Sequence, residues 1–202
     1  MEFFRRAPGN PVRLGVFPGT FNPPTRAHLE LVRAALTRVD EVVFVLPRVF
    51  PHKAYSGASF EERVVMLETA ARGDDQVSIA ATERGLFIDI AAECRQAYHP
   101  AIRLSFLCGR DAAERVAGWD YGRTGAFAEM LDVFDLLVAS RDGDYRPPEL
   151  FRDRIHTLDT PASLDEISAT RVREQAAQGG DWQSLVPAEI LPHVAKIYTR
   201  RP

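Results

Sequence analysis

The fold of this chain is decided by the stretch L-G-V-F-P-G-T-F-N-P-P-T-R-A-H, which runs from Leu14 to His28. Its apolar start predicts a strand that stops at Pro18-Gly19-Thr20, and Asn22-Pro23-Pro24 predicts a turn. Apolar residues at helical spacing follow, so we expect Thr25 to cap a helix that carries His28 in its first turn. A helix start offers unpaired backbone N–H groups and a partial positive charge, and a histidine there adds a donor that can be charged. The segment therefore suits a phosphate.

The remainder of the chain alternates between strand-like and helix-like runs. Such alternation is typical of an α/β fold, and we expect a Rossmann-like, doubly wound, mostly parallel sheet with helices on both faces. Residues 1–202 are expected to form a single domain that includes the helices from about residue 168 onward. Ligands of such sheets bind beyond the carboxyl ends of the strands. Strands are expected at residues 13–17, 42–46, 77–80, 102–108, 133–139 and 154–158, and helices at 26–36, 60–71, 89–98, 169–178 and 187–199.

Composition and charge argue against several classes of protein. With 46% apolar and 26% charged residues the chain has the composition of an ordinary globular protein, and its net charge of -3 argues against broad nucleic-acid binding. Two cysteines are too few for a disulfide framework, and no apolar stretch is long enough to span a membrane. The first residues do not resemble a signal peptide. We therefore expect a cytoplasmic protein without nucleic-acid or membrane partners, for which a homo-oligomer stays open.

A second group of polar residues lies near the C-terminus, in Glu166-Ile167-Ser168-Ala169-Thr170-Arg171-Val172-Arg173. Ser168 is a good N-cap for the helix that follows it. Hydroxyl residues at a helix start, here Ser168 and Thr170, can donate hydrogen bonds to phosphate oxygens, and Arg173 can reach the same anion bidentately. Taken alone, the segment is equally well explained as a cap followed by a surface arginine.

Three further polar groups follow predicted strands. Gly109-Arg110-Asp111 ends the 102–108 strand, where a glycine lets a ligand approach the backbone and an aspartate can accept from ribose hydroxyls. Ser140-Arg141 follows the 133–139 strand, and Arg141 is a candidate phosphate ligand or a structural ion-pair partner. Pro51-His52-Lys53 follows the 42–46 strand, and Lys53 is a candidate phosphate ligand or a solvated charge.

Residues that would form a metal site or a nucleophilic centre do not cluster in the sequence. The histidines other than His28 are scattered without an i, i+4 pair, and no G-x-S-x-G segment occurs. We expect no dedicated metal site and no nucleophile of that type.

The first segment resembles the G-T-F-x-P-(H/T)-x-G-H motif of the HxGH/TxGH nucleotidylyltransferases. The matching positions are Gly19, Thr20, Phe21, Pro23 or Pro24, Thr25 and His28, with Ala27 at the usual glycine. The C-terminal segment resembles the second motif of these enzymes, I-S-S-T-x-(I/V)-R, with Ala169 in place of one serine. The loop with Lys53 and the Gly109–Asp111 group also resemble family segments.

Trp119 narrows the resemblance. It stands eight residues beyond Asp111, the offset at which nicotinate-nucleotide adenylyltransferases place a tryptophan that stacks on the pyridine ring. A core or interface tryptophan is the alternative interpretation, whereas Trp182 is expected only to pack. The closing segment, from Leu185-Val186-Pro187 to Tyr198, also resembles this family and is expected to serve packing, not chemistry. The chain thus resembles a nicotinate/nicotinamide-nucleotide adenylyltransferase.

The resemblance implies the reaction of ATP with nicotinate mononucleotide to give the dinucleotide and pyrophosphate, as in NAD biosynthesis. Its partners would be ATP and a pyridine mononucleotide, and Mg²⁺ would arrive with ATP and need no carboxylate cage of the protein. The implied catalytic residues are His28, Thr25 and Arg173. The implied ATP-binding residues are Gly19, Thr20, Phe21, Gly109, Asp111, Ser168 and Thr170, and the implied substrate-binding residues are Lys53, Trp119 and Arg141.

One segment departs from the family. Where bacterial nicotinate-nucleotide enzymes usually carry S-Y-T-x-D-T, this chain has Gly85-Leu86-Phe87-Ile88-Asp89-Ile90, which keeps only the aspartate. The choice between nicotinate and nicotinamide therefore stays open. Two alternatives also remain, adenylyl transfer to another phosphorylated substrate such as phosphopantetheine, and a nucleotide-binding homologue without turnover.

Overall fold

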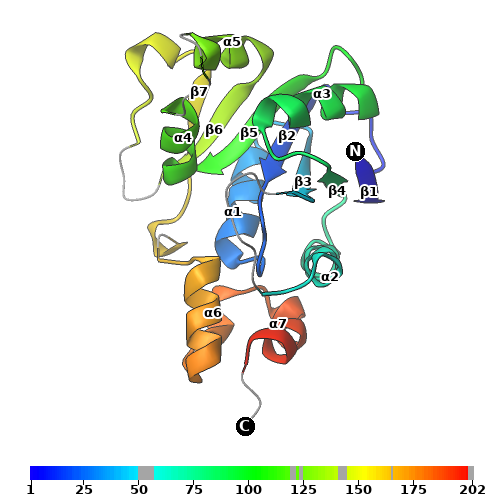
Figure 1. Ribbon diagram of the computed structural model, residues 1–202, viewed down its shortest axis with the longest axis vertical. Helices are drawn as coiled ribbons and strands as arrows, with labels where there is room; N and C mark the ends of the chain where they lie inside the picture. Colours follow the sequence, from blue (N-terminus) through cyan, green and yellow to red (C-terminus); the bar gives the residue numbers. More distant parts are fainter. Residues whose placement is uncertain (50–56, 119–121, 123–124, 141–144, 165, 200–202) are drawn as a thin grey trace.

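The fold is built on one sheet, as the computed structural model in Figure 1 shows. The structure describes residues 1–49, 57–118, 122, 125–140, 145–164 and 166–199. Within these ranges seven strands form the sheet in the order β1-β4-β3-β2-β5-β6-β7. The strands are β1 (Glu2–Arg5), β2 (Arg13–Pro18), β3 (Glu41–Pro47), β4 (Val77–Thr82), β5 (Arg103–Gly109), β6 (Asp135–Ser140) and β7 (Ile155–Asp159).

The sheet has the topology of a doubly wound fold. The strands from β2 to β7 pair in parallel, and their order, numbered along the chain from β2, is 3-2-1-4-5-6. The order reverses between β2 and β5, which makes the carboxyl ends of these two strands the expected ligand crevice. The prediction of a mostly parallel α/β sheet is confirmed.

Strand β1 is absent from the sequence-based prediction. It runs antiparallel to β4 at the edge of the sheet, with Phe3 opposite Ala80. The four residues Glu-Phe-Phe-Arg are too short to show the alternation that marks a strand, so only pairing with β4 reveals it.

Helices cover both faces of the sheet, as predicted. On one face α3, α4 and α5 pack over residues such as Val43 and Val45, and on the other α1 and α2 pack over Val42 and Phe44. Helices α4 and α5 were not predicted, and Val133, expected in a strand, ends α5 instead. The helices are α1 (Arg26–Ala35), α2 (Phe60–Ala70), α3 (Phe87–Ala97), α4 (Arg110–Ala117), α5 (Ala126–Val133), α6 (Ala169–Gln178) and α7 (Leu191–Tyr198), with short 3₁₀ turns at η1 (Glu149–Phe151), η2 (Ala162–Leu164), η3 (Gln183–Leu185) and η4 (Ala188–Ile190).

The closing helices α6 and α7 form a third hydrophobic cluster with α2. Met66 of α2, Val172 of α6 and Val194 of α7 are fully buried in it. Trp182 is only 5% exposed in the same cluster, which confirms its predicted packing role. Figure 1 shows α6 and α7 together at the end of the molecule away from α3, α4 and α5.

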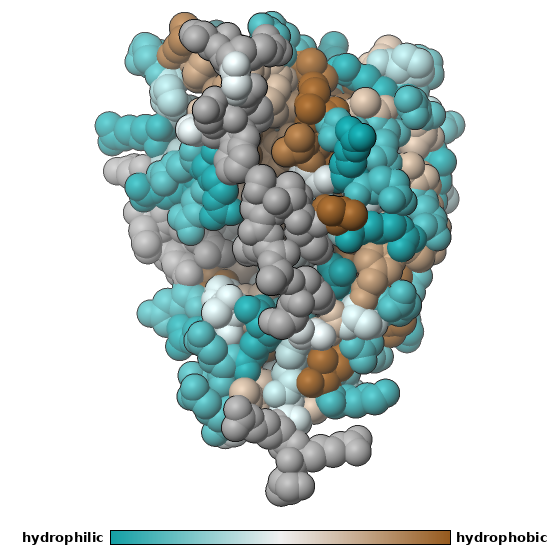
Figure 2. All heavy atoms as spheres, viewed as in Figure 1, coloured by the Kyte–Doolittle hydropathy of each residue, from teal (hydrophilic) through white to brown (hydrophobic). Residues whose placement is uncertain are grey.

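The surface is mainly hydrophilic on the side seen in Figure 2, where hydrophobic residues form small separate patches. Among the described residues no helix combines the length and the apolarity that a membrane crossing requires. Exposed large apolar residues include Leu86 and Ile88 at the start of α3.

Candidate functional site

The loop between β2 and α1 has a conformation that its own aromatic residue dictates. Phe21 has a φ of 47°, in the left-handed region, and its ring is 2% exposed against Phe17 and Phe44. A Cβ at Gly19 would lie 2.8 Å from the Phe21 ring, so a glycine is needed there for packing. The Gly19 N–H donates to the Val45 carbonyl oxygen at 3.0 Å. Phe21 can therefore contact a ligand only through its backbone.

Thr25 and His28 form a reciprocal cap at the start of α1. The Thr25 N–H donates to His28 Nδ1 at 2.9 Å, and Thr25 Oγ1 accepts from the His28 N–H at 3.4 Å. Because Nδ1 accepts, this hydrogen-bond network assigns the imidazole proton to Nε2. The predicted cap is confirmed, and it fixes the tautomer of the His28 ring.

The direct phosphate contact expected of Thr25 stays a prediction, and the structure adds a positioning role to it. The residue is 1% exposed, and its hydroxyl lies 2.9 Å from His28 Nδ1 and accepts from the His28 backbone N–H. A hydroxyl held in this cap helps to orient His28.

A small cavity lies beside His28, at the carboxyl edge of the sheet. Its volume is about 120 Å³, well below the roughly 300–1,000 Å³ of a complete ligand pocket, so it would hold one part of a nucleotide. Thr160 and Leu164, which sequence reasoning did not single out, contribute to it. The lining residues are Phe17, Ala27, His28, Leu31, Gly109, Ala139, Thr160 and Leu164.

Gly109 brings the end of β5 into this cavity. Its φ of -78° is accessible to any residue, yet a Cβ added there would meet no atom within 4 Å. The glycine thus leaves open space beside His28 that a side chain would occupy. Asp111 follows in the first turn of α4 and is exposed. The two strand ends at the switch point, after β2 and after β5, therefore share one site.

The second sequence motif meets the first at the β2–α1 loop. Ser168 caps α6 as predicted, because its Oγ accepts from the Arg171 N–H at 3.1 Å. Arg173 donates from Nη2 to Thr170 Oγ1 at 3.1 Å and from Nη1 to the Asn22 carbonyl oxygen at 2.7 Å. The structure thus joins segments that lie 151 positions apart.

Arg63 is a residue whose role sequence reasoning missed. It is 4% exposed, and its Nη1 donates to the carbonyl oxygen of Thr20 at 3.0 Å. One signal could have revealed it, because Arg63 occupies the apolar stripe of α2 with Phe60, Val64 and Leu67 at helical spacing. A charged residue in such a stripe needs a buried partner.

The chemistry available at the site is that of cations and hydrogen-bond donors. Burial raises the pKa of the Cys108 thiol, at the end of β5, to about 12, so this thiol is not a nucleophile at neutral pH. The described part of the chain holds no group of three or more histidine, cysteine or acidic residues arranged for a metal ion. Arg63 and Arg173 both donate to carbonyl oxygens of the β2–α1 loop, and guanidinium groups are well suited to binding an anion.

Comparison with known proteins shows the family of this chain. The model of the cytidylyltransferase-like family matches residues 16–175. Probable nicotinate-nucleotide adenylyltransferases of Gloeobacter violaceus and Solibacter usitatus are 31% and 33% identical to the chain, covering 91% and 88% of it and 94% of each relative. The chain belongs to the nicotinate-nucleotide adenylyltransferase family.

The family fold is recognisable in distant structures as well. Nicotinic acid mononucleotide adenylyltransferase of Plasmodium falciparum, complexed with NaAD, superposes with a TM-score of 0.69 over 91% of this chain and 95% of its own. The sequence identity is 15%, so the likeness concerns the fold.

In this nicotinate-nucleotide adenylyltransferase family member, the segment at the start of α3 that lacks the expected hydroxyl residues has a packing role. Phe87 stacks on Phe106 of β5, with ring centroids 4.5 Å apart. Leu86 and Ile88 are 42% and 39% exposed, and Asp89 lies 4.0 Å from Arg84. The segment therefore offers a ligand apolar side chains and backbone groups in place of hydroxyls.

Three predicted substrate-binding residues, Lys53, Trp119 and Arg141, lie outside the described residues. Their assignments stay predictions.

Proposed function

We propose that this chain transfers the adenylyl group of ATP to nicotinate or nicotinamide mononucleotide, giving the dinucleotide and pyrophosphate in NAD biosynthesis. The observation that carries the proposal is the bond between Arg173 and Asn22, which joins the two phosphate-directed helix starts at the switch point. Membership of the nicotinate-nucleotide adenylyltransferase family supports the acceptor.

The reaction needs alignment more than covalent chemistry. A phosphate oxygen of the mononucleotide attacks the α-phosphorus of ATP in line, and the bond from that phosphorus to the β-phosphate bridging oxygen breaks. Pyrophosphate leaves with the electron pair. Charge builds on the oxygens around the α-phosphorus, so donors aimed there lower the barrier. Holding the two phosphates in line removes most of the entropic cost.

His28 and Arg173 supply the proposed donors. Under this proposal His28 donates from Nε2 to the α-phosphate, because its Nδ1 accepts from the Thr25 N–H. Arg173 has five N–H donors, and the two bonds that it makes to protein oxygens leave others for the β- and γ-phosphates. Ser168 and Thr170 complete that helix start.

The remaining residues recognise the rest of the substrates. The open space at Gly109 admits the nucleotide, and Asp111 accepts from its ribose hydroxyls. The loop from Gly19 to Phe21 contacts ATP through its backbone. Lys53 and Arg141 bind mononucleotide phosphate, and Trp119 stacks on the pyridine ring.

Mg²⁺ enters as part of the substrate. It arrives with ATP, keeps mainly water and phosphate ligands, and offsets the charge of the leaving pyrophosphate. We also propose a single domain, because α6 and α7 share a hydrophobic cluster with α2. A cytoplasmic location is supported by two free, buried cysteines.

A pyrophosphate-release assay tests the proposal. ATP is combined with nicotinate mononucleotide, nicotinamide mononucleotide or phosphopantetheine, and turnover is expected with the pyridine mononucleotides. Turnover with phosphopantetheine but with neither pyridine mononucleotide would show that the proposed acceptor is wrong. ATP binding without turnover on any acceptor would indicate a nucleotide-binding homologue.

A further inference from the structure

Asn22 connects the β2–α1 loop to three distant parts of the chain. The residue is 4% exposed, and its carbonyl oxygen accepts from Arg173 of α6. Its side-chain Oδ1 accepts from the Ala58 N–H at 3.2 Å and from the hydroxyl of Tyr198, the last residue of α7. A Cβ at Gly57 would come within 2.6 Å of Asn22 Nδ2, so the amide is closely enclosed.

The Tyr198 hydroxyl makes a hydrogen bond that the packing of its ring does not require. Its ring packs against the hydrophobic cluster of α2, α6 and α7. Ile190 and Val194 are buried in that cluster and anchor the closing helix. The hydroxyl itself reaches back 176 positions to Asn22. A buried amide oxygen that loses a donor pays a desolvation cost, and the loop can then relax away from the observed position.

We propose that Tyr198 is a positioning residue for the ATP site, acting through Asn22 on the loop and on Arg173. The same residue that receives the tyrosine hydroxyl on its side chain receives the Arg173 guanidinium on its backbone. A shift of Asn22 therefore moves the acceptor that orients Arg173. The proposal rests on the proposed function and assigns the closing helix a role beyond packing.

The test compares Tyr198→Phe with Tyr98→Phe. Both variants remove one hydroxyl that donates to a buried acceptor. Tyr98, however, donates to Glu41, the first residue of β3, which lies at the amino-terminal ends of the strands and away from the proposed ATP site. Both variants should lower the melting temperature. Only Tyr198→Phe should reduce kcat/KM for ATP and ATP affinity by calorimetry, by about 3- to 10-fold for one lost neutral hydrogen bond. The KM for the mononucleotide should stay unchanged.

A double-mutant cycle tests whether the effect of Tyr198 on ATP affinity passes through Asn22. Once Asn22→Ala has removed Oδ1, adding Tyr198→Phe should cause no further loss of ATP affinity. Equal and independent losses would overturn the proposal. If Asn22→Ala does not fold, the comparison of the two tyrosine variants decides alone.

The outcomes separate this inference from the proposed function. Normal ATP parameters in Tyr198→Phe, with wild-type turnover intact, would overturn the positioning role and leave the function standing. A wild-type protein that binds ATP but turns over no acceptor would refute the function, and calorimetry would still decide the role of Tyr198. A wild-type protein that binds no ATP would overturn both.

Discussion

Arg173 donates from Nη1 to the carbonyl oxygen of Asn22 at 2.7 Å, and so ties the helix start of α6 to the loop that precedes α1. Each of these segments alone could be an ordinary capped helix. Under the proposed function, their direct contact, in the loop that follows β2, makes them two halves of one anion site.

His28 should contribute to turnover and, to a smaller extent, to stability. His28→Ala is expected to lower kcat by roughly two to four orders of magnitude, because it removes a donor to developing charge. It also removes the acceptor for the Thr25 N–H, which costs about 0.5–2 kcal/mol as other caps do. His28→Asn offers an acceptor near the Nδ1 position without the Nε2 donor, so its unfolding free energy should recover while kcat stays low. More than half of the wild-type rate in either variant would remove His28 from the mechanism.

Arg173 should distinguish ATP from AMP. Arg173→Ala is expected to weaken ATP binding by about 1.5–3 kcal/mol, the value of one charge-assisted contact, and AMP binding much less, because AMP lacks the outer phosphates. Isothermal calorimetry measures both. The matched control is Arg171→Ala on the same helix, whose side chain pairs with Glu166 at the surface and should leave ATP affinity unchanged. Equal losses for ATP and AMP would place Arg173 away from the outer phosphates.

Trp119 should determine binding of the pyridine mononucleotide. Trp119→Ala is expected to weaken mononucleotide binding by roughly 1–3 kcal/mol, the value of base–aromatic stacking, with ATP binding nearly unchanged. Fluorescence quenching and calorimetry measure the two affinities. Trp182→Phe serves as control, because Trp182 lies in the α2–α6–α7 cluster and its replacement should alter stability instead. Intact mononucleotide affinity in Trp119→Ala would refute the stacking assignment.

Discrimination between nicotinate and nicotinamide should be weaker than in relatives that carry the hydroxyl-rich segment. Leu86, Phe87 and Ile88 offer only backbone hydrogen bonds, and strong rejection of the wrong substrate requires a polar group that it leaves unpaired. The ratio of kcat/KM for the two mononucleotides measures this. A ratio above about 10⁴, the level reached by a dedicated hydrogen-bonding site, would contradict the expectation.

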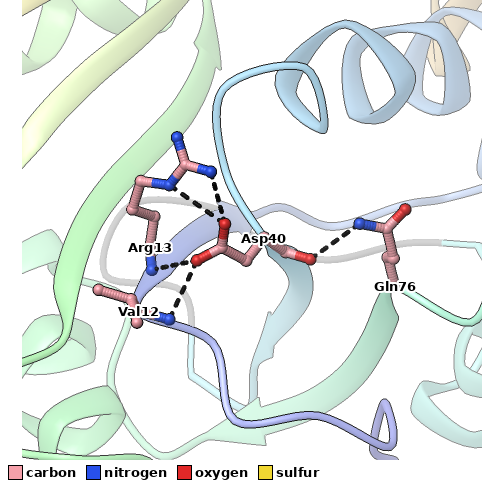
Figure 3. A network of polar contacts seen from close by, with 4 residues as sticks. All are labelled: Val12, Arg13, Asp40 and Gln76. Carbon is pink, nitrogen blue, oxygen red and sulfur yellow. Dashed lines mark hydrogen bonds and ion pairs between the residues drawn. The ribbon is translucent and has the colours of Figure 1, made fainter.

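Asp40 should make stability depend on acid pH. Figure 3 shows its carboxylate accepting from the Val12 and Arg13 N–H groups and from the Arg13 guanidinium. These bonds, above all the one from the Arg13 side chain, lower the pKa of Asp40. A lowered folded-state pKa contributes stability above the unfolded value of about 3.9 and loses it as the pH falls through the folded value.

Urea unfolding at several pH values tests this expectation. Asp40→Asn should be less stable than the wild type at pH 7, by of order 1 kcal/mol because the pair is partly exposed. The difference should shrink below about pH 4, where the wild-type carboxylate becomes protonated. A constant difference down to pH 2 would show that the charge of Asp40 does not stabilise the fold. Activity should be unaffected, since the network lies at the amino-terminal edge of β2 and β3.

The sequence by itself determined the local units of this protein. The strand, turn and capped helix from residue 13 to 35, and the cap at Ser168, follow from spacing and side-chain chemistry within a few residues, where the competing conformations are few. Alternation of such units was enough to predict the parallel sheet. A short element with few buried side chains, such as α4, was not predicted. Among its described residues the buried one is Ala113.

Only the tertiary structure decided what these units contact. The bonds of Arg173, Arg63 and Tyr198 to the β2–α1 loop span 43 to 176 positions, and nothing in local periodicity encodes such partners. They form because α6 and α7 bury their apolar faces against α2. This packing places the three polar side chains beside the loop, although no sequence pattern near them indicates the contact. Because Asn22 and Arg63 are buried, losing their partners would cost more free energy than the bonds themselves contribute.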